Sequence, residues 1–187
     1  MQNILTTEDL PPGYGSVNPF VAVSGAGGAD AFIRFVSDVF DARETLAAHT
    51  IDADGLLIHA EVRIGDSTVM LCDSKPHWSF TPALLQVYVR DLPAVVRRAR
   101  THGADVFTEP TDFHGRQRLA RFRDRWTNVW WLFEYGPDST APSEGPNELP
   151  GWQPDPSAPP SYVHQTIDAV LTTLTRPGPQ DASRASG

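Results

Sequence analysis

The sequence predicts an α+β fold in which a βαβββ unit occurs twice. Residues 18–73 and 84–135 each show the order strand, helix and three further strands. Each helical segment carries one apolar stripe at helical spacing, and the strand segments alternate with period two. We therefore expect paired modules at 18–73 and 84–135, a lead-in at 1–17 and a Pro-rich extension at 136–187.

Composition excludes several classes of protein. The chain has 187 residues, 40% of them hydrophobic, which is enough for one medium domain or two joined modules. Its formal charge of −8 argues against nucleic acid as a partner. The single cysteine, Cys72, excludes an intrachain disulfide framework and favours the cytoplasm. No secretory signal is evident at 1–15, and no apolar stretch approaches the roughly 20 residues that would span a membrane.

In the first module we expect a strand at 18–24, ended by the glycine-rich segment 25–28. A helix follows at 30–43, where the apolar residues share one face: Phe32, Phe35, Val36, Val39 and Phe40. Residues 44–51 suit an exposed strand. The Asp54-Gly55 turn then leads into strands at 56–64 and 67–73.

In the second module we expect a strand at 84–90 and then a helix that Asp91 caps and Gly103 ends. A short strand at 105–108, a loop at 109–117 and strands at 118–123 and 128–135 complete the unit. Ten of the 17 prolines lie beyond residue 135, so 136–160 suits an extended linker. An amphipathic helix at 162–174 either docks back on the chain or serves a partner, and we expect the last dozen residues to be disordered.

Several segments carry a resemblance to a known family. They are Ile58–Ser67 in the first module and, in the second, Val89–Asp91, Gly115, Ala120–Asp124 and Asn128–Trp131. Through these segments, the region 18–135 resembles the vicinal oxygen chelate (glyoxalase / bleomycin-resistance / dioxygenase) superfamily, in particular its PhnB-like members. The usual phrase Arg-Phe-x-Asp-Pro-x-Gly-Asn has Arg125 in place of proline and Thr127 in place of glycine here, which affects the expected turn geometry.

The resemblance implies that the two modules form a curved mixed sheet, the glyoxalase/bleomycin-resistance fold, with helices on its convex side. It also implies a homodimer and a concave cup that binds a small molecule. Metal-dependent members take ligands from the first and last strands of each module, which here means positions near Asn18, Met70, Leu84 and Trp131. These side chains are poor ligands for a hard divalent ion, so we expect no metal and no other cofactor.

Strand alternation predicts which side chains line the cup. Leu84, Gln86 and Tyr88 would share one strand face, and Phe20, Met70, Cys72, Val129, Trp131 and Phe133 would join them. Such a surface suits a planar organic ligand. The hairpin arginines, among them Arg118 and Arg121, either bind an anionic group of that ligand or are solvated. We take the ligand-binding candidates to be Phe20, Gln86, Tyr88, Arg118, Arg121, Trp131 and Phe133.

His59 and Glu61 are the candidates for catalysis. They are two residues apart on one strand, so their side chains emerge as neighbours and could form an acid–base pair. The alternative is a polar pair on the sheet with no chemical role.

Three functions follow from these observations. The first is a protein that sequesters an aromatic metabolite or drug in a metal-free cup. The second is a lyase or isomerase that uses His59 and Glu61, as an acid–base pair or as an atypical metal site. The third is an interaction module whose acidic surface and tail helix serve a partner. We favour binding, with catalysis second.

Overall fold

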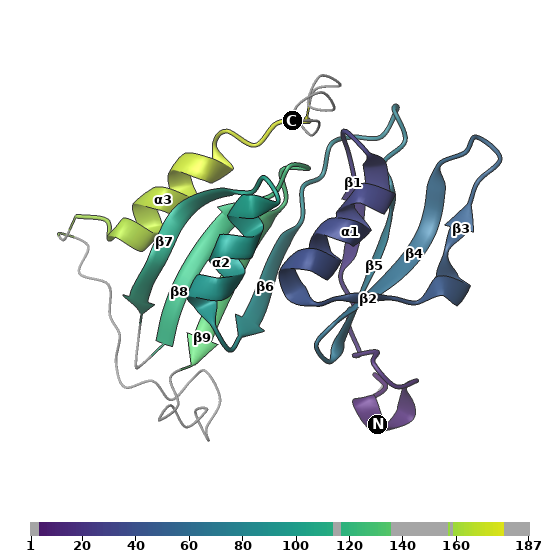
Figure 1. Ribbon diagram of the computed structural model, residues 1–187, viewed down its shortest axis with the longest axis horizontal. Coiled ribbons are helices and arrows are strands. Elements are labelled where there is room, and N and C mark those ends of the chain that lie inside the picture. The colour runs from purple at the N-terminus through teal and green to yellow at the C-terminus, as the bar shows by residue number, and fades with distance from the viewer. Residues whose placement is uncertain (1–3, 114–116, 136–156, 158, 178–187) are drawn as a thin grey trace.

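The computed structural model describes residues 4–113, 117–135, 157 and 159–177. Two modules lie side by side, each with its own mixed sheet (Figure 1). The strands of the first sheet follow the order β1-β5-β4-β2, with β3 paired to β4. The elements of this module are β1 (Phe20–Val23), α1 (Gly28–Phe40), β2 (Arg43–Glu44), η2 (Leu46–Ala48), β3 (Thr50–Ile51), β4 (Leu57–Ile64) and β5 (Ser67–Asp73). The strand expected at 44–51 is therefore divided by a 3₁₀ turn.

The second sheet has the order β6-β9-β8-β7. Its module comprises β6 (Leu84–Val89), α2 (Leu92–Thr101), β7 (Asp105–Phe113), β8 (Gln117–Arg123) and β9 (Val129–Tyr135). The loop predicted from residue 109 is wrong, because β7 continues to Phe113 through Pro110. A proline is tolerated there since β7 is an edge strand, and its pairing with β8 shifts register twice. Gly115 and most of the expected linker 136–160 lie outside the described residues.

The register of the two sheets shows that the modules are true repeats. Met70 on β5 pairs with Phe20 on β1 and with Glu61 on β4. At the equivalent place, Trp131 on β9 pairs with Gln86 on β6 and with Arg121 on β8. In both modules the first strand runs parallel to the last, as a βαβ crossover requires.

The repeat extends to the contacts that anchor each helix. Asp73 at the end of β5 accepts the backbone N–H of Ala29 at the start of α1 at 2.7 Å. Glu134, at the equivalent position of β9, accepts the N–H of Leu92 at the start of α2 at 2.8 Å. A carboxylate near a helix N-terminus satisfies an unpaired amide and interacts favourably with the helix dipole.

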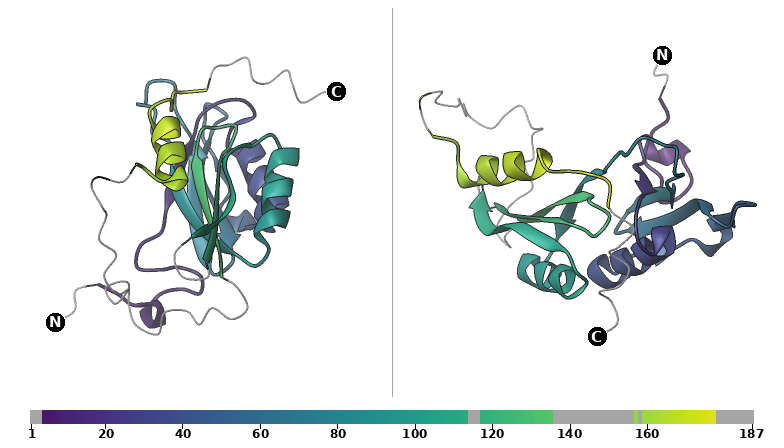
Figure 2. Two further views of the ribbon diagram at one scale, coloured as in Figure 1. Left: turned by 90° about the vertical axis from the view of Figure 1, so that its left-hand side faces the viewer. Right: turned by 90° about the horizontal axis from the view of Figure 1, so that it is seen from above.

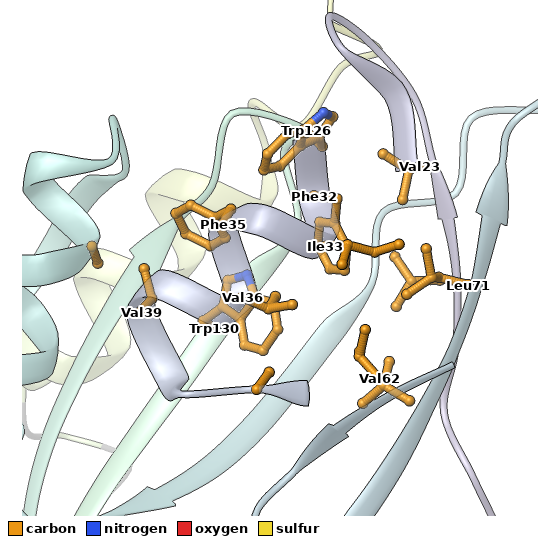
Figure 3. Packing of buried hydrophobic residues seen from close by; sticks show 14 of the residues in the cluster. Val23, Phe32, Ile33, Phe35, Val36, Val39, Val62, Leu71, Trp126 and Trp130 are labelled. Atoms are coloured by element: carbon orange, nitrogen blue, oxygen red, sulfur yellow. The ribbon is translucent and has the colours of Figure 1, made fainter. Parts of the chain in front are cut away.

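The helices α1 and α2 lie together on one face of the two sheets, and one hydrophobic core lies beneath them (Figures 1 and 2). The helix of the first module also packs on strands of the second (Figure 3). Phe32 lies 5.4 Å from Trp126 and 6.2 Å from Trp130 between ring centroids, and Phe40 lies 4.8 Å from Trp130. These aromatic contacts join the modules into one body.

We call the opposite side of the sheets, away from α1 and α2, the open face. It corresponds to the concave side expected from the sequence. A terminal segment lies on it in each module (Figure 2). Near the N-terminus, after η1 (Thr7–Asp9), the carbonyl of Pro12 accepts from Arg63 at 2.8 Å and that of Gly13 accepts from Thr68 at 2.7 Å. The helix α3 (Tyr162–Leu171), within the segment expected to be helical, contacts β7.

The turn between β8 and β9 contains the two residues that depart from the family phrase, Arg125 and Thr127. Thr127 has φ of 67°, the left-handed conformation that a glycine would adopt more readily. The hydroxyl of Thr127 donates to the carbonyl of Trp126 at 2.7 Å, and its backbone N–H donates to the carbonyl of Asp124 at 3.1 Å. Thr127 therefore introduces backbone strain at the position where the family phrase has glycine.

Candidate functional site

The open face of the second module presents an aromatic surface. Alternation along β6 places Gln86 and Tyr88 on this face, where the Gln86 amide donates to the Tyr88 hydroxyl at 2.7 Å. The Tyr88 ring lies 5.8 Å from that of Phe133 on β9, and Phe113 from β7 lies 5.9 Å from Phe133 on its other side. Tyr88 is 58% exposed while Phe133 is buried, so Phe133 is held by packing and the Tyr88 ring is accessible to a ligand.

Beside this surface, Arg121 and Trp131 lie beneath α3. The guanidinium carbon of Arg121 is 4.0 Å from the centroid of the Trp131 ring, which is a cation–π contact. Nη1 of Arg121 donates to the carbonyl of Val163 at 2.6 Å. Thr108 on β7 and Thr166 on α3 share a hydroxyl hydrogen bond of 2.7 Å. The face of α3 that meets the sheet is thus held by polar contacts as well as by its apolar stripe.

A cavity of about 630 Å³ lies between the two modules, a size that suits a small organic ligand. Gln86 and Tyr88 line one side of it, and the β4–β5 turn and the segment before β1 line the other. Phe40 and Trp130 are among its apolar lining residues, and two basic residues, Arg90 after β6 and Arg98 on α2, also line it. Arg98 is held there by Nε and Nη2, which donate to one backbone carbonyl of α1 at 3.0 and 2.8 Å.

On the open face of the first module, His59 and Glu61 are in contact. Nε2 of His59 lies 3.3 Å from Oε1 of Glu61. The hydroxyl of Tyr14, from the N-terminal segment, donates to Oε2 of Glu61 at 2.5 Å. This hydrogen bond, with desolvation and the charge of Glu61, raises the pKa of Tyr14 above its ordinary value. The sequence alone contained no signal for Tyr14, because it lies in a loop distant from Glu61 along the chain.

Two of the predicted ligand-binding residues do not join these groups. The side chain of Phe20 is half-exposed on the open face of β1, beside Met70 of the first module. Arg118 alternates to the other face of β8, where Nη1 donates to Glu134 at 3.0 Å. Since Glu134 also holds the amide at the start of α2, Arg118 belongs to a structural contact on the helix side. The structure therefore groups Gln86, Tyr88, Phe133, Arg121 and Trp131 on one face and sets His59 and Glu61 apart from them.

The residues at the family's metal positions do not fit a divalent ion. Leu84 has no donor atom, and the indole of Trp131 lies against a guanidinium, where a second cation would be repelled. The thioether of Met70 suits soft metals alone, and both amide atoms of Asn18 are engaged with the backbone of residue 15. Among the described residues, no group of three or more His, Cys, Asp or Glu side chains is placed to hold a metal ion.

No family model and no curated protein matches the sequence. Solved structures do match. TioX from Micromonospora sp. ML1 is 21% identical with a TM-score of 0.50, and the match covers 66% of this chain and 98% of that protein. A glyoxalase/bleomycin resistance protein/dioxygenase family enzyme from Burkholderia phytofirmans PsJN is 19% identical with a TM-score of 0.51. That match covers 66% of this chain and 98% of the enzyme. A PhnB protein from Bacillus cereus is 17% identical, with a TM-score of 0.49 and coverage of 63% and 98%.

At these identities the likeness concerns the fold. The structure from Burkholderia phytofirmans PsJN carries the glyoxalase and bleomycin-resistance description that the doubled βαβββ pattern predicted. Within the described residues, no helix is both long and apolar enough to cross a bilayer. By its architecture and these matches, the chain has the α+β fold of the glyoxalase/bleomycin-resistance proteins.

Proposed function

We propose that this chain binds a small aromatic molecule between its two modules, beside the Gln86 and Tyr88 side chains of β6. The observation that carries the proposal is the cavity of about 630 Å³ that Gln86 and Tyr88 line, next to the Tyr88–Phe133 aromatic pair. A flat ring that enters the cavity would lie against Tyr88, while the polar atoms of the Gln86 amide would orient it. Binding without chemistry is consistent with donor groups that do not fit a metal.

The binding proposal is tested with a neutral fluorescent probe, N-phenyl-1-naphthylamine. We expect its fluorescence to rise on binding, and we expect Tyr88→Ala to weaken binding at least about tenfold, because a ring contact in a pocket contributes roughly that factor. Ile51→Ala, which removes another half-exposed apolar side chain on the first module, is the matched control. Equal affinity in the Tyr88→Ala and Ile51→Ala proteins would refute the placement of the ligand.

A second candidate function is proton transfer by a lyase or isomerase, and the contacts of Glu61 favour it. Glu61 lies between the imidazole of His59 and the hydroxyl of Tyr14, and the His59 side chain is 36% exposed, so a ligand can reach it. Such a pair could move a proton on or off a carbon acid. The test is exchange of a ligand C–H for deuterium in ²H₂O, followed by NMR. Exchange that persists at the same rate in His59→Ala would remove this role.

We also propose that the chain forms a homodimer. The support is a pair of apolar side chains, those of Leu84 and Phe20, that remain half-exposed in the single chain. Sedimentation velocity at micromolar concentration measures the assembly state directly. A monomer at 100 µM would contradict the proposal.

We place the chain in a reducing compartment such as the cytoplasm. Its single cysteine, Cys72, is buried, and burial raises the pKa of its thiol, so Cys72 is suited to packing rather than to disulfide exchange. Fractionation of cells that express the chain, followed by detection with an antibody, would locate it. Recovery from a secreted or periplasmic fraction would contradict this assignment.

A further inference from the structure

Beneath α3 two buried hydrogen-bond donors find no acceptor within the part of the chain that the structure describes. Arg121 is 2% exposed, and its Nε has no hydrogen-bond partner among the described residues. The same holds for Nε1 of Trp131, the ring on which the Arg121 guanidinium lies. Most buried polar atoms in folded proteins are paired, and an unpaired one destabilises the fold. Two such donors, on side chains that contact each other, indicate a place built for an acceptor.

Within the described part of the chain, the charge of Arg121 has no carboxylate counter-ion. Its neighbours on β8 are paired, Arg118 with Glu134 at 3.0 Å and Arg123 with Asp105 at 2.9 Å. No carboxylate of the described residues forms an ion pair with Arg121, although burial makes its charge more costly. Desolvation lowers the pKa of Arg121 to about 10, which leaves the guanidinium charged at neutral pH.

The group that does meet Arg121 is a neutral carbonyl of α3. This helix has ten residues, too few to be stable by itself in water. Of its side chains Val170 is buried, while Tyr162 and Leu171 remain almost half-exposed. The helix is held to the sheet by the Val163 carbonyl and by a few further hydrogen bonds. A weakly docked helix thus covers the guanidinium and bonds its Nη1, leaving Nε without an acceptor, where an anion could serve the guanidinium more favourably.

We propose that Arg121 and Trp131 form a site for the anionic group of an aromatic carboxylic acid, and that α3 competes with this ligand for the guanidinium. The inference rests on the proposed function, because the ring of the same ligand would lie toward the cavity. The register supports this arrangement, since Trp131 is paired with Gln86, which lines the cavity. A carboxylate would supply a negative charge beside the Arg121 guanidinium. Its oxygens would also accept hydrogen bonds from the two buried donors.

The test compares 1-naphthoate with its nearly isosteric neutral analogue, 1-naphthamide, by calorimetric titration of the full chain. We expect naphthoate to bind at least about tenfold more tightly, because hydrogen bonds to a charged acceptor are roughly twice as strong. In Arg121→Met the preference should fall to within about twofold, since methionine keeps much of the volume but not the charge. Arg123→Met, on the same strand, should retain the preference and is the matched control.

Competition by α3 is tested by undocking the helix. Val170→Asp places a charge at the buried side of α3, whereas Ala169→Asp places the same charge on its exposed side. We expect Val170→Asp to raise the affinity for naphthoate at least about threefold relative to Ala169→Asp, because less of the protein then has its site covered. Equal or weaker affinity in Val170→Asp would refute the competition.

The outcomes separate this inference from the proposed function. Equal affinity for naphthoate and naphthamide would overturn the anion site and leave aromatic binding intact. If N-phenyl-1-naphthylamine binds and naphthoate does not, the anion site is likewise refuted. Absence of binding by all three probes would overturn both proposals. If circular dichroism shows that Arg121→Met does not fold, the comparison of naphthoate with naphthamide on the native chain still tests the anion site.

Discussion

Replacement of Asp124 by asparagine tests how the second module is closed. Asp124 is 3% exposed, and Oδ1 accepts the backbone N–H groups of Trp126 and Asn128, both at 2.9 Å. Oδ2 accepts Nδ2 of Asn128 at 3.0 Å and Nε1 of Trp130 at 2.9 Å. In asparagine one oxygen becomes an NH₂ group, so two donors lose their acceptor. The Asn128 amide cannot turn to compensate, because its Oδ1 already accepts the N–H of Ala83.

The structure also gives the size and the pH dependence of this effect. Two buried donors without acceptors, at about 1–3 kcal/mol each, predict a loss of about 3 kcal/mol in the free energy of unfolding at pH 7. Burial raises the pKa of Asp124 to about 6, although hydrogen bonds from Trp130 and Asn128 oppose the rise. The folded chain therefore holds this proton more tightly than the unfolded chain does. The resulting stability is present below about pH 4 and is lost as the pH rises through about 6.

The assay is urea unfolding of both proteins at pH 4.5, 5.5 and 7, followed by tryptophan fluorescence. Because the asparagine does not titrate, the penalty of Asp124→Asn should be about 2 kcal/mol larger at pH 4.5 than at pH 7. Asp105→Asn, which weakens an exposed ion pair with Arg123, should cost less than about 1 kcal/mol and serves as the control. A penalty for Asp124→Asn below 1 kcal/mol at pH 7, or one that shrinks in acid, would refute the reasoning.

Three further changes follow from the same structure. Thr127→Gly should raise the free energy of unfolding by up to about 1 kcal/mol, measured by urea unfolding, because glycine removes left-handed strain that outweighs its own entropy cost; a loss of stability would contradict this. Phe32→Ala should cost about 4 kcal/mol in the same assay, since Phe32 is fully buried between the modules, and a cost below 2 kcal/mol would show that the core collapses around the gap. Ultraviolet titration should reveal one tyrosine that ionises at a higher pH than the others, because the hydrogen bond to Glu61 raises the pKa of Tyr14. Tyr14→Phe should remove this high-pH step. A titration curve that Tyr14→Phe leaves unchanged would exclude the contact.

Most of the fold was predictable because each module carries its own periodic pattern. The strand at 67–73 has the predicted bounds, and the alternation on β6 placed Gln86 and Tyr88 on the face opposite the helices. The extent of β7 was not predictable, because Pro110 ordinarily ends a strand and is tolerated here at a sheet edge. Nor could Arg118 and Arg121 be assigned to faces, since the start of β8 was blurred by the expected loop. The structure places them on opposite sides of the strand.

The two modules place opposite charges at equivalent positions, and each charge meets a terminal segment. Glu61 accepts from the Tyr14 hydroxyl, and Arg121 donates to the Val163 carbonyl, so each terminal group has the polarity that its partner requires. Neither the Tyr14 hydroxyl nor the Val163 carbonyl is charged, so neither neutralises the charge that it contacts. Glu61 has the imidazole of His59 beside it, and 12% of its side chain reaches solvent. Arg121 has less exposure and no such neighbour, so an ionic ligand would gain more at the second module than at the first.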